Sequence, residues 1–197
     1  MPNWTYNTIR VEGSKDSLTK FMTDGLANAH KPEKEGDNPQ LSLSSWIPTP
    51  ETFLKYDTTN HPDGKGLKVG DKWWDGLGDH GDKVVTEELI EEFKQATKEQ
   101  KEKYGVVGWY DYNVKTFGCK WDSKVNMEND VPWEIILTAD TPWSAPNNWL
   151  RTLSKNYPEL TFKLHAVYEE GFWEDAEYNE GLEAELGSGE YELEEEE

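Results

Sequence analysis

Alternating and nearly continuous apolar patterns predict three strands. Residues 4–12 (WTYNTIRVE) alternate between two sides, with Ile9 and Val11 on the same side, as in a strand with one buried face. Residues 133–141 form a nearly continuous apolar run, which is typical of a central strand, and residues 160–168 alternate again. We therefore expect these three segments to share one sheet.

Three other segments carry apolar residues at helical spacing. The helix over 16–26 has Ser14 or Asp16 available as its cap. The helix over 86–105 starts at a threonine followed by two glutamates and ends at a glycine, with lysines in its last turns. The helix over 146–156 is opened by Ser144 and Pro146 and ended by Pro158. Each of these helices lies next to a predicted strand.

The remaining segments are less regular. Residues 41–46 (LSLSSW) alternate like a strand, and residues 57–83 are a glycine- and aspartate-rich insertion with almost no periodicity. Residues 109–118 (WYDYNVKTFG) also alternate, with tyrosines and a valine on one side. Residues 172–197 can add an edge hairpin before an acidic tail.

The order of elements predicts an α+β fold. Strands flanking capped helices, with the helices on one face of a mostly antiparallel sheet, indicate a ferredoxin-like sandwich. We expect a single domain over residues 1–186 with an insertion at about 57–104, followed by an acidic tail at 187–197. The length of 197 residues suits one domain.

The apolar content of the sequence is low, but its aromatic content is high. Only 35% of residues are hydrophobic, yet there are 10 Trp, 9 Tyr and 6 Phe, so we expect an aromatic core. Trp4, Trp133 and Trp149 lie on periodic faces and are interpreted as core residues. The tryptophans in loops, Trp73, Trp74 and Trp143, either pack locally or are exposed side chains that bind a sugar or a protein.

The stretch 108–123 (GWYDYNVKTFGCKWDS) combines five aromatic residues with the only cysteine. We expect Trp109, Tyr112 and Trp121 to be mainly packing residues that fix the insertion against the sheet. Cys119 has no histidine near it in sequence, so we interpret it as an unreactive structural residue rather than a nucleophile. A single cysteine also excludes an internal disulfide and is typical of a reducing compartment.

Negative charge is the strongest global feature. The chain has 40 acidic and 20 basic residues, a formal net charge of −20. Residues 169–197 contain 14 of the acids and no Lys or Arg, so residues 1–168 have a net charge of only −6. Direct binding to nucleic acid or anionic lipid is disfavoured, because such binding depends on Lys and Arg. A basic partner is favoured instead.

The acidic end is therefore the candidate binding surface, although charge runs usually serve solubility alone. Alternate residues of a strand lie about 6.6 to 6.8 Å apart, so glutamates two positions apart can form a regular row of charge. The candidate partner-binding residues are Glu169, Glu170, Phe172, Trp173, Glu174, Asp175, Glu177, Tyr178, Glu183, Glu185, Glu190 and Glu192.

Catalytic and metal-binding patterns give little support for an enzyme. The four histidines are scattered, and the sequence contains no HExxH, CxxC, GxSxG, Walker or GxGxxG pattern. The loop around Trp73, Trp74, Asp75 and Asp79 is a secondary candidate site, but its spacing does not match an EF-hand. We expect no catalytic residues, no metal and no cofactor.

The start PNWTYNTIRVEG, the segment SLSSWIPTPE after the first predicted helix, and the stretch WYDYNVKTFGCKWDS carry a combination of motifs. In these motifs the sequence resembles the YubB-type family of phage- and plasmid-borne proteins, which have a ferredoxin-like domain. The resemblance spans roughly residues 2–180, with a cysteine at 119 where a threonine is expected and an acidic end beyond the usual frame. It implies the fold and a mobile-element origin, but no reaction. The matching residues are Pro2, Asn3, Trp4, Asn7, Ile47, Pro48, Pro50, Trp109, Asn113, Gly118, Lys120, Trp121 and Asp122.

Two hypotheses for function follow. The first is a non-enzymatic inhibitor that occupies the basic, nucleic-acid-binding surface of a host defence complex, such as a CRISPR effector or a restriction enzyme. Its acidic residues would replace phosphates. The second is an enzyme of mobile-element maintenance with its site in the aspartate-rich loop. The sequence has no apolar run of transmembrane length and no signal peptide, so we expect a cytoplasmic protein.

Overall fold

The computed structural model describes residues 3–31, 38–73, 83–131 and 133–191. The chain divides into two compact units, and each is described on its own. The sheet unit comprises Met1–Pro48 and Thr116–Glu197, and the helical unit comprises Thr49–Lys115.

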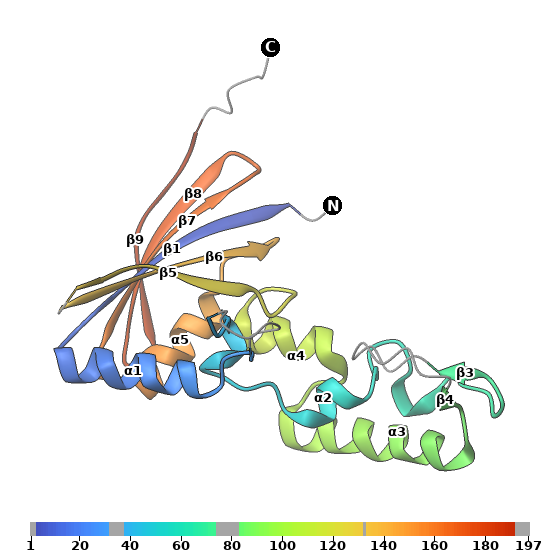
Figure 1. Cartoon of the computed structure of the whole chain (residues 1–197). Coiled ribbons are helices and arrows are strands. Elements are labelled where there is room, and N and C mark those ends of the chain that lie inside the picture. Colours follow the sequence, from blue (N-terminus) through green and yellow to red (C-terminus); the bar gives the residue numbers. More distant parts are fainter. Residues whose placement is uncertain (1–2, 32–37, 74–82, 132, 192–197) are drawn as a thin grey trace. The chain divides into compact units, whose positions relative to one another are not determined.

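The sheet unit is built on a seven-stranded antiparallel sheet with the strand order β2-β5-β6-β1-β7-β8-β9. Helices α1 (Lys15–Ala27) and α5 (Asn147–Asn156) lie on one of its faces (Figure 1). The fold is therefore α+β and ferredoxin-like, as the sequence predicts. The strands are β1 (Trp4–Glu12), β2 (Leu41–Ser42), β5 (Lys124–Val131), β6 (Glu134–Pro142), β7 (Thr161–Tyr168), β8 (Phe172–Asn179) and β9 (Leu182–Glu190).

The three strands with the clearest patterns form the centre of this sheet. β1 pairs with β6 on one side and with β7 on the other, and all three alternate between buried and more exposed residues. Ile9, Leu137 and Phe162 are among the fully buried side chains that face the helices. This confirms the prediction that 4–12, 133–141 and 160–168 share one sheet.

Helices α1 and α5 begin and pack as their sequences indicate. The Ser14 side chain accepts a hydrogen bond from the Ser17 backbone N–H at 3.2 Å and caps α1, which buries Leu18 and Phe21. Helix α5 buries Trp149, whose indole N–H donates to the Leu43 carbonyl at 2.9 Å. The helix face of the sheet therefore carries an aromatic core.

Two predictions of local structure were wrong. In segment 41–46 only β2 is extended, because the chain continues as the 3-10 turn η1 (Leu43–Ser45). Segment 109–118 is not extended, since nearly all of it belongs to helix α4 (Gly108–Phe117), which buries Tyr112 and exposes Tyr110 and Val114.

The helical unit has its own small core. Helix α3 (Glu87–Glu99) is capped by the Thr86 side chain and continues as the π-helical segment η3 (Gln100–Tyr104). It stops at Gly105, which has a φ of 72°, as the sequence predicts. The other described elements are α2 (Glu51–Lys55), the 3-10 turn η2 (Pro62–Gly64), β3 (Lys72–Trp73), β4 (Lys83–Val84) and most of α4.

Gln100 is a buried polar residue that holds this unit together. Its side-chain oxygen accepts hydrogen bonds from the Thr58 hydroxyl at 2.6 Å and from the Gly108 N–H at 3.0 Å. Its side-chain nitrogen donates to the Thr52 carbonyl at 2.6 Å. Because these groups come from separate segments, the amide orders part of the insertion that the sequence pattern leaves without structure.

Candidate functional site

The acidic hairpin is the region from Glu169 to Glu190, which contains β8 and β9. Its turn consists of Glu180 and Gly181, with φ values of 50° and 81°. Two successive residues with positive φ form the type of turn that joins tightly twisted antiparallel strands. β9 is the outermost strand on this side of the sheet, so the hairpin presents a free edge.

Nine carboxylates lie in the acidic hairpin, which contains no Lys or Arg. Within the described part of the chain, two basic side chains from outside the hairpin contact its carboxylates. Arg151 forms an ion pair with Glu183 at 2.5 Å, and the His165 Nδ1 atom lies 2.7 Å from the Asp175 carboxylate. Among the described residues, Arg151 is the only Lys or Arg that forms an ion pair with these nine carboxylates. Most of the negative charge is therefore not neutralised.

Glu169 and Glu170 are held in the turn between β7 and β8 by hydrogen bonds from the start of the chain. Glu169 accepts from the Trp4 backbone N–H at 2.6 Å and from the Tyr6 hydroxyl at 3.0 Å. This contact with a carboxylate raises the pKa of Tyr6. Glu170 accepts from the Asn3 side-chain nitrogen at 2.6 Å. The carboxylates of Glu169 and Glu170 are thus exposed, and these hydrogen bonds fix their orientation.

A β-bulge changes the spacing of charge along β9. The pairing with β8 shifts between Asp175 and Ala176, so that Gly187 lies opposite Asp175 and Glu185 lies opposite Ala176. Because of the extra residue, Glu185 and Glu190 are on the same side of the strand although they are five positions apart. Among the described residues of β9, regular two-residue spacing holds for Glu183 and Glu185 only.

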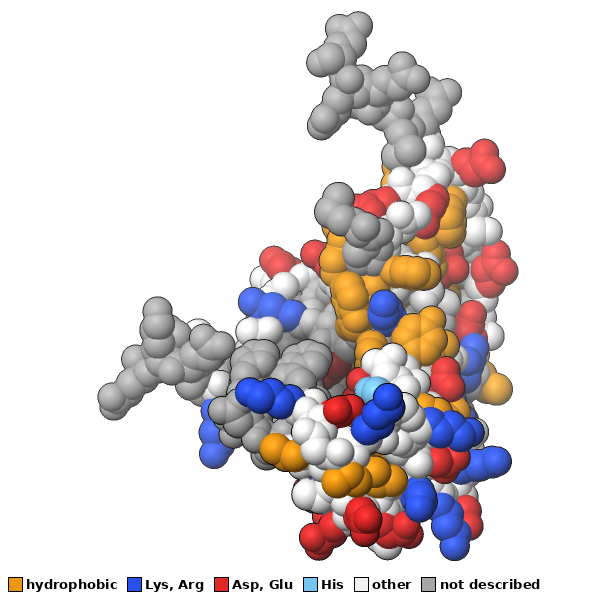
Figure 2. Space-filling view, turned by 90° about the vertical axis from the view of Figure 1, so that its right-hand side faces the viewer, with side chains coloured by type: hydrophobic (Ala, Val, Ile, Leu, Met, Phe, Trp, Pro, Cys, Tyr) orange, Lys and Arg blue, Asp and Glu red, His pale blue; other side chains and the backbone are white. Residues whose placement is uncertain are grey.

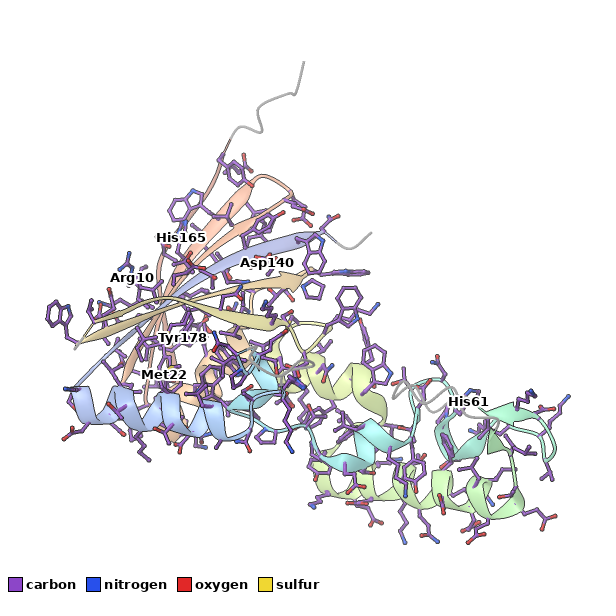
Figure 3. The ribbon with its side chains drawn as sticks, in the orientation of Figure 1. Arg10, Met22, His61, Asp140, His165 and Tyr178 are labelled. Carbon is purple, nitrogen blue, oxygen red and sulfur yellow. The ribbon has the colours of Figure 1, made fainter. Side chains whose placement is uncertain are left out.

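The aromatic residues of the hairpin differ in exposure. Phe172 is 40% exposed and stacks on Tyr168 at a centroid distance of 4.0 Å. Trp173 packs over the backbone of β9, where a Cβ added to Gly189 would lie 2.9 Å from its Nε1 atom. Tyr178 is fully buried on the helix side of the sheet, opposite to His165 (Figure 3). The prediction that Tyr178 contacts a partner was wrong, since it is a core residue.

Some predicted site residues cannot be placed. Glu192 and the loop residues Trp74, Asp75 and Asp79 lie outside the described residues, and only the backbone of Trp73, in β3, is described. In the part of the chain that is described, no group of three or more His, Cys, Asp or Glu residues could hold a metal ion. None of the described helices is both long and apolar enough to cross a bilayer.

A second surface feature joins residues that are far apart in sequence. Trp4, Trp121 and Trp143, together with Lys120, form what we call the tryptophan cluster. The rings of Trp4 and Trp121 lie 5.9 Å apart, and the Lys120 Nζ atom lies 5.3 Å from the Trp121 ring centroid and 5.7 Å from that of Trp143. Figure 2 shows hydrophobic side chains gathered around a basic one on the face that it draws.

The tryptophan cluster lies at the end of the sheet where β1 begins and β6 ends. Trp121 is 38% exposed and Trp143 is 59% exposed. The prediction that Trp121 is mainly a packing residue was therefore wrong in part. Trp133, which we predicted to be a core residue, is 67% exposed in the turn between β5 and β6, at the opposite end of the sheet.

Trp143 has an unfavourable backbone conformation. Its φ of 76° lies in the left-handed region, which bulky side chains rarely adopt and which costs of order 1–3 kcal/mol. Its N–H donates to the Asn3 carbonyl at 2.8 Å, which fixes the turn from β6 toward α5. A glycine would adopt this turn without strain, so turn formation alone does not require a tryptophan.

Cys119 lies next to the cluster in sequence but is not part of the surface. It is only 1% exposed, and its thiol donates to the Trp121 carbonyl at 3.4 Å. Burial raises the pKa of the thiol to about 12. A thiol that stays protonated near neutral pH is a poor nucleophile, which agrees with the interpretation of Cys119 as structural.

The fold and the two surface features describe an α+β protein with a ferredoxin-like sheet, an acidic edge and an aromatic end. Residues 120–197, which include β5 to β9 and α5, match the family model described as the ferredoxin-like domain in Api92-like protein. Among solved structures, the crystal structure of a protein api92 from Yersinia pseudotuberculosis is similar to this chain. The identity is 12%, the TM-score is 0.49, and the alignment covers 98% of this chain and 99% of that chain. No curated protein matches the sequence.

Proposed function

We propose that this chain is a non-enzymatic inhibitor that binds the basic, nucleic-acid-binding surface of a host defence complex, such as a CRISPR effector or a restriction enzyme. The carboxylates of the acidic hairpin replace the phosphates of the nucleic acid. The observation that carries the proposal is the free edge strand β9, whose carboxylates Glu183, Glu185 and Glu190 are exposed, with only Glu183 paired to a Lys or Arg among the described residues.

Two properties of the acidic hairpin support a basic protein partner. Clusters of one sign of charge speed the association of oppositely charged proteins and suppress binding to others of the same sign. In addition, Glu169 and Glu170 are already oriented by hydrogen bonds, so less side-chain freedom is lost when they pair with a base.

The biological setting is part of the same proposal. The motifs that resemble the YubB-type family favour an origin in a phage or plasmid, and inhibition of host defence is an activity that benefits such elements. The partner would then be met in the cytoplasm of a bacterial host.

The proposal can be tested by measuring inhibition together with its dependence on charge. Purified CRISPR effector or restriction enzyme is mixed with labelled DNA, and displacement of the DNA by this chain is followed at increasing salt. We expect displacement that weakens as salt screens the interaction. The double variant Glu185→Lys and Glu190→Lys should lose most of it.

A matched control changes the same number of charges elsewhere. Glu91 and Glu102 are exposed residues of the helical unit, and reversing both to Lys changes the net charge equally. If both double variants inhibit as well as the unchanged chain at physiological salt, the acidic hairpin is not the binding surface. If the control loses as much inhibition as the hairpin variant, only total charge matters and the proposed site is wrong.

A further inference from the structure

We propose that the tryptophan cluster binds an arginine side chain of the basic partner, between the ring of Trp143 and the carboxylate of Glu170. This inference rests on the proposed function for the nature of the partner, but its geometry uses only Glu169 and Glu170 at the start of the acidic hairpin and no residue of β8 or β9. The ligand proposed for the exposed aromatic end of the sheet is therefore a guanidinium group.

The first argument is that the cluster already interacts with a cation. The Lys120 ammonium lies within 6 Å of the ring centroids of both Trp121 and Trp143, which is the range of favourable cation–π contact. Trp4 packs against Trp121 and helps to fix the orientation of its ring. The rings of Trp121 and Trp143 therefore already make cation contacts with Lys120, and more than a third of each side chain remains exposed.

The second argument is that a carboxylate is connected to Trp143 through a single residue. The Asn3 carbonyl accepts the N–H of Trp143, and the Asn3 side chain donates to the Glu170 carboxylate. The neighbouring residue in the same turn, Glu169, accepts a hydrogen bond from the Trp4 backbone N–H. A guanidinium group stacks flat on an aromatic ring while its edge donates hydrogen bonds to a carboxylate, which a lysine ammonium does less well.

The third argument comes from the strain at Trp143. The backbone holds a large ring in the left-handed region, and more than half of that side chain is exposed. Neither burial nor the turn explains the choice of tryptophan. Strained residues with exposed side chains are typical of binding sites, where the strain is compensated elsewhere in the structure.

Other ligands of aromatic surfaces agree less well with these observations. Nucleotides and single-stranded nucleic acids stack on tryptophan, but their phosphates would be repelled by Glu169 and Glu170. Neutral sugars can donate hydroxyl hydrogen bonds to the two carboxylates, but only a cation also gains from their negative charge. The combination of exposed indole faces with acidic neighbours selects a planar cation.

The test uses a blocked peptide, Gly-Arg-Gly-Arg-Gly, and its counterpart in which citrulline replaces arginine. Citrulline keeps the planar shape but has no charge. Binding is followed by the NMR signals of the indole N–H groups and by tryptophan fluorescence. We expect the arginine peptide to shift the signals of Trp121 and Trp143, and the citrulline peptide to bind about tenfold more weakly or not at all.

The variant Trp143→Gly separates binding from stability. Glycine relieves the strain at this φ, so the melting temperature should stay the same or rise, while affinity for the arginine peptide should fall about tenfold. The matched control is Trp133→Gly, which removes an even more exposed tryptophan at the other end of the sheet. It should leave peptide affinity unchanged.

The inference is overturned if the citrulline peptide binds as tightly as the arginine peptide, or if the two glycine variants bind the arginine peptide equally well. It is also overturned if the indole signals of the unchanged protein do not respond to the arginine peptide. Because no defence complex is present in this experiment, it can fail while the salt-dependent inhibition persists. Conversely, arginine binding here without inhibition would contradict the proposed function alone.

Discussion

The indole ring of Trp46 lies against Gly25 of helix α1 so closely that a Cβ added to the glycine would be 2.4 Å from the Trp46 Cε2 atom. The ring is held there by a hydrogen bond from its Nε1 to the Phe21 carbonyl at 2.9 Å and by stacking on Phe21 at 4.9 Å. It cannot move aside without losing both contacts.

Gly25→Ala is therefore expected to destabilise the protein, although alanine normally favours a helix by about 1 kcal/mol. Overpacking of this kind costs about 1–3 kcal/mol or more, which outweighs the gain in helix propensity. The measurement is urea unfolding followed by circular dichroism. Thr23→Ala, at an exposed position of the same helix, should change stability much less. A more stable Gly25→Ala protein would show that Trp46 does not pack as described.

Trp149 and Trp121 should differ in their contribution to stability. Trp149 is fully buried, and its truncation to alanine also removes the indole N–H that donates to the Leu43 carbonyl, so we expect a loss of about 3–5 kcal/mol. Trp121 is partly exposed, and its truncation should cost no more than about 2 kcal/mol. Equal losses in urea unfolding experiments would contradict the exposure of the tryptophan cluster.

Cys119 should react with thiol reagents only when the protein unfolds. Its thiol is buried and its pKa is raised to about 12, so almost no thiolate exists at neutral pH. Labelling with a chromogenic disulfide should be slow in the folded protein and fast in urea. Rapid labelling of the folded protein at pH 7 would mean that the thiol is accessible and that Cys119 must be reconsidered as a reactive residue.

Stability should fall as the pH rises above about 10. Burial raises the pKa of Tyr157, Tyr168 and Tyr178 above the ordinary value of 10.0, and Asp24 and Glu174 add to the effect by hydrogen bonding to the first two. The unfolded chain therefore loses these protons at lower pH than the folded protein does, so alkaline conditions favour unfolding. Below about pH 10 the three tyrosines do not affect the pH dependence.

Melting temperatures between pH 8 and pH 11.5 will check this expectation. The variant Tyr178→Phe removes one of the three groups, so its stability should decline less steeply at high pH. If the melting temperature of the unchanged protein stays constant up to pH 11, burial does not raise these pKa values as described.

The parts of the fold that the sequence predicts are those in which one face is buried. β1, β6 and β7 alternate clearly because one side of each strand meets the helices and the other does not. α1 and α3 start at residues whose side chains cap the helix. Such patterns are local, and they can be read without knowledge of the neighbours.

Other elements have no local pattern. β5 (KVNMENDV) contains few strand-forming residues and pairs with β2 through only two residues, so it escaped prediction. Helix α4 buries Asn113 along with Tyr112 and Phe117, and this buried polar residue hides the helical spacing. The alternating tyrosines of the same segment suggested a strand instead.

The two candidate sites also differ in whether their residues are close together in sequence. The acidic hairpin could be predicted because its charges are contiguous in sequence. The tryptophan cluster could not, because Trp4, Trp121 and Trp143 meet only after the sheet has formed. A signal was available at Trp121, where a lysine comes directly before an aromatic residue, but it does not identify the other two rings.

The bulge in β9 has a further consequence for the behaviour of the protein at high concentration. A free sheet edge can pair with the edge of another copy and start aggregation, especially with exposed leucines such as Leu182 and Leu186. Here the glutamates of two approaching edges would repel each other, and the bulge interrupts the regular backbone hydrogen bonding that such pairing needs. Resistance of this edge to pairing between copies then depends on the negative charge carried along β9, so removing that charge would expose the edge to aggregation.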